Sequence, residues 1–345
     1  MSNVKKFNRA TFFQGLVAGV LLTHVTLFLN HKSILNASLF AGFYALGTAF
    51  SSKIKFLPSK VINLVALLFR LTLLTLTFLS FSNYLNFLLV GGGFLLAVLS
   101  RRQFIDLKTA IGQVEITELT RHGSFNALGY GFGSAFAGFL LTSDPLAYSS
   151  ILFCALLAYG YYPVLPKNNK FNNSGLSKRD VWVAVFFTAA ITPLSNAVVL
   201  IVIADLYTNQ LSGLAVLAYS TGSIFSSKLG WYLRERNFPI AKSVWAGALL
   251  FVPILLTGNL LVILATRFLT GSFLYNAQGL LEERTHKESV GQKGLDYLWT
   301  LFSLVSFTLI LILPKIGQLY GFYLLPLFSF LLGIFISFLR RFIKN

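Results

Sequence analysis

The chain carries the segment YALGTAFSSKI at residues 44–54 and a near copy of it, YSTGSIFSSKL, at residues 219–229. Six of the eleven aligned positions are identical, and the offset from Gly47 to Gly222 is 175 residues, about half of the 345-residue chain. In both copies an apolar stretch ends and a short basic segment begins. The repeat therefore predicts that the chain is an internal duplication of two similar halves.

Long apolar stretches elsewhere in the chain follow the same offset. A helix needs about 17 to 25 mostly apolar residues to cross a membrane, and continuous stretches indicate helices where alternating ones would indicate barrel strands. Gly91, Gly92 and Gly93 interrupt the fourth stretch, so counts of ten or eleven spans stay open. The twelve predicted spans are residues 12–29, 34–50, 61–81, 85–99, 125–141 and 146–165, and then residues 181–203, 211–225, 244–257, 260–275, 297–313 and 316–339.

The composition excludes a water-soluble protein. Hydrophobic residues make up 55% of the chain and charged residues only 11%, with a mean hydropathy of +0.72. The net charge of +17 comes from basic residues that lie between apolar stretches, so no nucleic-acid partner is expected. One cysteine and four scattered histidines give no spacing for a metal site, and no nucleotide-binding loop is present, so no metal or cofactor is expected.

The positions of the basic residues predict the topology. If the N-terminus is cytoplasmic, 24 of the 28 Lys and Arg residues fall in cytoplasmic segments of the twelve-span pattern. Lys32 and Lys315 fall in outer connections, while Arg70 and Arg267 lie inside predicted spans. This distribution follows the positive-inside rule for an even number of spans. It predicts a multi-pass protein of a plasma membrane or a bacterial inner membrane, with both termini in the cytoplasm.

Together these features predict an all-α integral membrane protein with about twelve transmembrane helices in two parallel six-helix bundles. The first bundle comprises residues 1–166, a cytoplasmic linker follows at residues 167–180, and the second bundle comprises residues 181–345. Duplicated bundles are typical of secondary transporters, in which the substrate path lies at the interface between the repeats.

The repeated segment resembles a loop motif of the major facilitator superfamily, which runs roughly Gly-x-Leu-Ala-Asp-Arg-x-Gly-Arg-Lys. Gly47 and Gly222 match its first glycine, and Lys53 and Lys228 are the equivalent basic residues of the two copies. The acid of that motif is a serine in both copies. The resemblance implies the fold of that family, in which spans one, four, seven and ten line a central cavity.

Two further motifs support the resemblance. The fifth span contains Gly129, Gly133 and Gly138 and is similar to the glycine-rich fifth helix of the family's exporters, which implies export in preference to uptake. In the tenth span, the segment from Arg267 to Gly271 resembles the Arg-Phe-x-x-Gly of the family's fourth helices.

Arg267 is the first candidate for contact with a substrate. An ionisable side chain at mid-bilayer costs at least about 2.5 to 3.5 kcal/mol on insertion scales, so it usually faces a cavity or a partner. Thr270 follows it on the same helix face. A guanidinium group with no acid nearby suits a substrate carboxylate or phosphate, and the equally weighted alternative is that it holds two helices together. Arg70, in the third span, is predicted to make such a structural contact.

Further polar residues inside the spans are candidates for the cavity lining. Thr188, Thr192 and Asn196 lie at i, i+4 and i+8 of the seventh span, and Gln14 is a similar candidate in the first. Polar packing between helices is the alternative interpretation of all four residues.

The distribution of acids restricts the mechanism. No Asp or Glu lies in the middle of a span, so proton transfer or gating would depend on His24 or Asp205, or another coupling ion would drive transport. A cationic cavity favours neutral or anionic solutes over organic cations. We therefore expect a secondary transporter that moves a small organic solute by alternating access, and not an enzyme. A polytopic enzyme such as a lipid-linked transferase, and a transporter-like subunit that has lost transport, are the alternatives.

Overall fold

The computed structural model describes residues 3–50, 58–79, 83–111, 116–139, 192–235, 252–287 and 292–321. These ranges are helical and contain no strand, so the predicted all-α class is confirmed. The predicted sixth span, the linker at residues 167–180 and most of the twelfth span lie outside the described residues. The described helices are α1 (Asn3–Lys32), α2 (Ile34–Phe50), α3 (Ser59–Leu79), α4 (Asn83–Ile111), α5 (Ile116–Phe139), α8 (Thr192–Leu206), α9 (Asn209–Glu235), α11 (Val252–Leu256), α12 (Leu260–Lys287) and α13 (Gln292–Tyr320).

The surface of this helical assembly suits a lipid environment. Asn8–Lys32, Lys60–Thr77 and Ser303–Tyr320 are long and apolar enough to cross a membrane. Large apolar side chains are exposed, among them Phe87 at 79% and Leu261 at 74% of their area. Such surface is favourable against hydrocarbon and unfavourable against water.

The 175-residue offset reappears in the helix boundaries. Ile34, the first residue of α2, becomes residue 209, which is where α9 begins. Adding 175 to the bounds of α4 gives residues 258 and 286, close to the bounds of α12 at residues 260 and 287. The start of α5 becomes residue 291, and α13 begins at residue 292. The short repeat thus marks a correspondence that extends over several pairs of helices.

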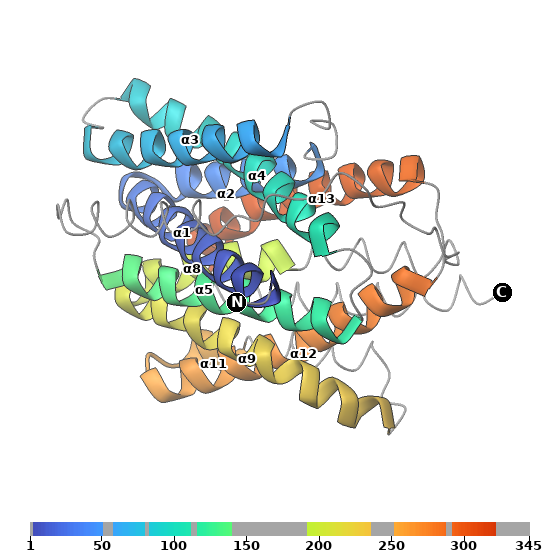
Figure 1. Cartoon of the computed structure of the whole chain (residues 1–345). Helices are drawn as coiled ribbons and strands as arrows, with labels where there is room; N and C mark the ends of the chain where they lie inside the picture. The colour runs from blue at the N-terminus through green and yellow to red at the C-terminus, as the bar shows by residue number, and fades with distance from the viewer. Residues whose placement is uncertain are drawn as a thin grey trace.

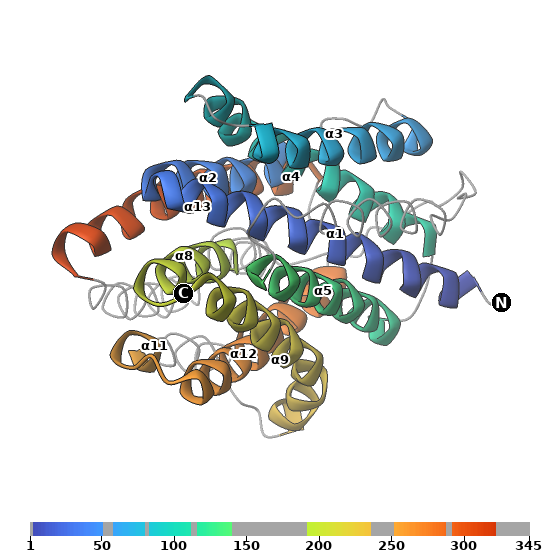
Figure 2. The same cartoon turned by 90° about the vertical axis from the view of Figure 1, so that its left-hand side faces the viewer.

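Helices from the two halves of the sequence pack against each other. Figures 1 and 2 show α3 and α4 on one side of the molecule and α9, α11 and α12 on the opposite side, with α1, α5 and α8 between them. The helix α1 packs against α5, and α9 packs against α12. The two most extensive contacts between the described helices of the two halves are α5 with α9 and α13 with α2. Applying the offset to either of these contacts gives the other.

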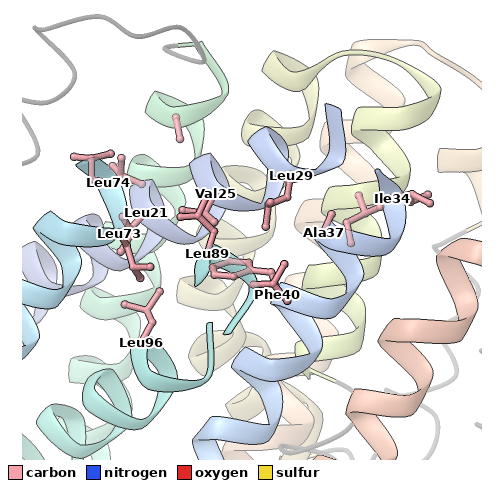
Figure 3. Close-up of a cluster of buried hydrophobic side chains, with 14 residues drawn as sticks. Leu21, Val25, Leu29, Ile34, Ala37, Phe40, Leu73, Leu74, Leu89 and Leu96 are labelled. Carbon is pink, nitrogen blue, oxygen red and sulfur yellow. The ribbon is translucent and has the colours of Figure 1, made fainter. Parts of the chain in front are cut away.

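Apolar side chains fill the space between the helices of the first half. One cluster contains Leu21 of α1, Phe40 of α2, Leu73 of α3 and Leu89 of α4, all buried (Figure 3). A second cluster joins α2 to the second half and includes Ala41, Val202 and Ile310. The first cluster also includes Ile201 of α8, so both clusters contain residues from the two halves of the sequence.

Glycines allow the closest helix contacts. A Cβ atom at Gly129 or Gly133 of α5 would collide with the backbone carbonyl oxygen of Phe12 or Leu16 in α1, and one at Gly138 would lie 2.7 Å from the carbonyl oxygen of Asn209 in α9. Small residues at such contacts let helix backbones approach within membranes. The glycine-rich fifth helix therefore packs against α1 on one face and against the second half on another.

The repeat glycines serve the same purpose. A Cβ at Gly47 of α2 would collide with the carbonyl oxygen of Phe94 in α4, and one at Gly222 of α9 with that of Phe268 in α12. The helix pairs α2–α4 and α9–α12 are equivalent under the offset. The two glycines thus make the same kind of contact in each half.

Candidate functional site

Arg267 lies at the crossing of α9 and α12. Its side chain is fully buried, and the guanidinium carbon lies 4.5 Å from the centre of the Tyr219 ring. A cation over a desolvated aromatic face gains about 2 kcal/mol. Gly271, one turn further along α12, packs against the backbone of Tyr219, which keeps the two helices close. The guanidinium group of Arg267 thus joins α12 to α9 through Tyr219. Its contact with a substrate anion stays a prediction.

Thr270 shares the burial of Arg267. Its hydroxyl donates to the backbone carbonyl oxygen of Thr266 at 2.7 Å, and both threonine side chains are buried. Such a bond back to the preceding turn satisfies the hydroxyl within its own helix. The predicted pair of Arg267 and Thr270 is therefore placed together, on the helix that packs against the repeat segment of α9.

Arg267 and Arg70 each lie near a tyrosine of the repeated segment. Tyr219 opens the second copy of the repeat, and its equivalent in the first copy, Tyr44, lies close enough to Arg70 for electrostatic interaction. The arginines themselves are not equivalent, since the offset converts residue 267 to residue 92, which is Gly92. Each half thus places a repeat tyrosine within electrostatic range of an arginine from a different helix, an arrangement that the sequence repeat does not predict.

Arg70 belongs to a buried polar network between α1, α3 and α4, centred on Gln103. The Gln103 side-chain oxygen accepts hydrogen bonds from Arg70 Nη2 at 2.7 Å and Gln14 Nε2 at 3.1 Å, and its Nε2 donates to Asn63 Oδ1 at 2.9 Å. Arg70 also donates to Ser100 Oγ at 3.1 Å. The contact between Arg70 and the adjacent helix agrees with its predicted structural role.

Sequence reasoning missed Gln103 because it lies beyond the predicted end of the fourth span at Leu99. Hydropathy records only the apolar part of a helix, whereas α4 continues to Ile111 and carries Gln103 into the protein interior. Gln14, predicted to line the cavity, is buried and bonded to Gln103. Its contact with a substrate stays a prediction.

His24 is buried between α1 and α3. Its Nε2 atom lies 3.0 Å from Thr77 Oγ1, and the Thr77 hydroxyl donates its own proton to the carbonyl oxygen of Leu74 at 2.7 Å. Because a hydroxyl has one proton, Thr77 must accept from His24, so the Nε2 atom of His24 carries a hydrogen. Any proton taken up by this ring from its neutral form would therefore go to Nδ1. Asp205, the other candidate for gating, is exposed near the end of α8.

The remaining predicted residues are placed only in part. Thr192 begins α8 and Asn196 follows about one turn later, on the same helix face, and Lys228 lies within α9. Thr188 and Lys53 lie outside the described residues. Within the described ranges, no group of three His, Cys, Asp or Glu side chains could hold a metal ion.

The fold is closely shared with solved transporters. The chain matches a bacterial homologue of the iron transporter ferroportin in its inward-facing state, with a TM-score of 0.64, 16% identity and coverage of 97% of this chain and 98% of that one. It also matches the nucleoside transporter NupG, with a TM-score of 0.63, 13% identity and full coverage of both chains. This is the fold of a membrane transporter. A bacterial metal transporter is similar too, with a TM-score of 0.58, 17% identity and coverage of 100% of this chain and 98% of that one.

The sequence matches no protein-family model and no curated protein sequence. At these identities the structural matches establish the fold and not the solute. The chain is a multi-span, all-α membrane protein, and the similar structures are transporters and not enzymes, in agreement with the prediction.

Proposed function

We propose that this protein is a secondary active transporter of the major facilitator superfamily, which moves a small organic solute by alternating access. The observation that carries the proposal is the agreement of nearly the whole chain with transporter structures, together with two interfaces between the halves that the duplication relates. Rocking of two equivalent bundles about a central site is the mechanism to which such repeats are suited. Both termini lie in the cytoplasm in this proposal, and the glycine-rich fifth helix favours export.

The charges inside the protein favour neutral or anionic solutes. Arg70 and Arg267 are buried basic side chains, whereas Asp205 is exposed at a helix end. Two buried cations raise the electrostatic potential of the interior, which repels organic cations and attracts carboxylates and phosphates. We assign the contact with the solute to the second half, at Arg267 and Thr270, and to the predicted stripe of Thr188, Thr192 and Asn196.

We infer that the conformation described is closed on the outer side. In the proposed topology α1 and α5 end there and α9 begins there, and the contacts between halves involve these ends. Leu27 of α1, Leu200 of α8 and Val216 of α9 form one buried cluster, and Gly138 of α5 packs against Gly213 of α9.

A comparison of solute levels tests the proposed function. Cells that produce the wild-type protein are compared with cells that lack it, and soluble metabolites are measured inside the cells and in the medium. We expect at least one small neutral or anionic solute to be redistributed toward the medium by the wild-type protein alone. Identical distributions in the two strains, or a change confined to organic cations or metal ions, would contradict the proposal.

A further inference from the structure

A side-chain hydrogen bond joins the two halves at the outer ends of α1 and α9. His31, the penultimate residue of α1, has its Nε2 atom 2.8 Å from Nδ2 of Asn209, the first residue of α9. Because an amide nitrogen only donates, His31 Nε2 accepts this bond. The two residues are 178 positions apart in the sequence and belong to different halves.

The α1 end of this bond is fixed to the first half. Lys32, next to His31, donates from Nζ to Asn86 Oδ1 of α4 at 3.0 Å, and its ammonium group lies 4.7 Å from the centre of the Phe28 ring. The backbone amide of Ser33 donates to the carbonyl oxygen of Leu29 at 2.8 Å. His31 therefore moves with α1 and α4 as one unit.

The α9 end is fixed to the second half in the same way. The Ser212 hydroxyl donates to the carbonyl oxygen of Leu200 in α8 at 2.7 Å, and the Tyr207 hydroxyl donates to that of Ile254 in α11 at 2.8 Å. These bonds hold the start of α9 against its own half. A change in the distance between the halves at this end must therefore act directly on the bond between His31 and Asn209.

The duplication does not account for this bond. The offset converts residue 209 to Ile34 and residue 31 to Leu206, and neither of these side chains can form a polar bond. The equivalent residues of α2 and α8 therefore cannot form this hydrogen bond. The polar pair therefore exists at one of two equivalent positions, both of which lie on the outer side in the proposed topology.

We propose that His31 and Asn209 form an outer latch, which stabilises the conformation closed on the outer side and breaks when the protein opens outward. The proposal rests on the proposed function, because it uses the topology and alternating access inferred above. Both residues lie at the surface, so the latch adjusts the populations of the two conformations while the apolar cluster beneath it excludes solutes.

Cysteine accessibility tests the outer latch without knowledge of the solute. The single cysteine, Cys154, is replaced by serine, and Val216→Cys is introduced as a reporter in the cluster beneath the latch. Intact cells are treated with a membrane-impermeant maleimide. Loss of one hydrogen bond changes an equilibrium by about three- to tenfold, so we expect His31→Ala or Asn209→Ala to speed labelling by that factor.

Three controls make the result decisive. Gln210→Ala changes an exposed neighbour of Asn209 and should label at the parental rate. His31→Gln keeps a hydrogen-bonding group and should label more slowly than His31→Ala. Gly138→Val forces α5 from α9 and should speed labelling, which verifies that the reporter senses outward opening. Labelling that rises with Gly138→Val but stays at the parental rate in both alanine variants would overturn the latch, and would leave the proposed transport function intact.

Discussion

The Arg267→Ala variant is expected to insert and fold but to lose transport. If the guanidinium binds an anionic group of the solute, its removal forfeits a charged hydrogen bond of about 1.5 to 3 kcal/mol, which lowers the apparent affinity for the solute roughly 10- to 150-fold. The measurement is the redistribution of the solute identified in the comparison of cells, normalised to the amount of protein in the membrane. Arg267→Lys retains the charge and should retain part of the activity.

Variants of Tyr219 separate the two roles of Arg267. Tyr219→Phe keeps the aromatic face under the guanidinium and should transport like the wild-type protein, because the cation–π contact persists. Tyr219→Leu removes that face and should lower thermal stability in detergent. Transport at the wild-type level in Arg267→Ala would end the hypothesis of an anion site and would leave Arg267 as a structural residue.

The Gly129→Ala variant is expected to be strongly destabilised. The added methyl group would meet the backbone of Phe12, which cannot rotate away as a side chain can, so α1 and α5 must separate. Overpacking of this kind costs about 3 kcal/mol. Thermal unfolding in detergent and the yield of monodisperse protein measure the effect.

Gly91→Ala is the matched control for this prediction. Nothing lies within 4 Å of a Cβ atom at Gly91, which is in the interior of α4. There alanine favours the helix by about 0.8 to 1 kcal/mol relative to glycine, so this variant should be as stable as the wild-type protein or more so. Equal stability of the Gly129→Ala and Gly91→Ala variants would contradict the close contact of α1 and α5.

Much of the fold can be predicted from the sequence, because membrane-spanning helices appear in it as long apolar stretches with basic residues between them. The repeat at Gly47 and Gly222 predicts the correspondence of α2 with α9, and both glycines lie at helix contacts as equivalent residues should. Helix lengths are less predictable. The sequence predicts that the eighth span ends at Phe225, whereas α9 continues to Glu235, because hydropathy detects only the apolar part of a helix.

The side-chain contacts of the candidate site were harder to predict. Arg267 was identified from its charge within an apolar span, but its contact with Tyr219 depends on the register in which α9 and α12 cross. Gln103 gave no signal, since a glutamine beyond a predicted span resembles any surface residue. Its hydrogen bonds join it to three side chains from α1 and α3, which only the tertiary structure brings together.

The sidedness of the two chain ends tests the central claim most directly. Epitope tags at the N-terminus and the C-terminus are probed with antibody in intact cells and again after permeabilisation. Two bundles inserted in the same orientation, each with six helices, predict that both tags bind antibody only after permeabilisation. Binding of antibody to one tag alone in intact cells would place the ends on opposite faces and contradict the duplicated transporter architecture.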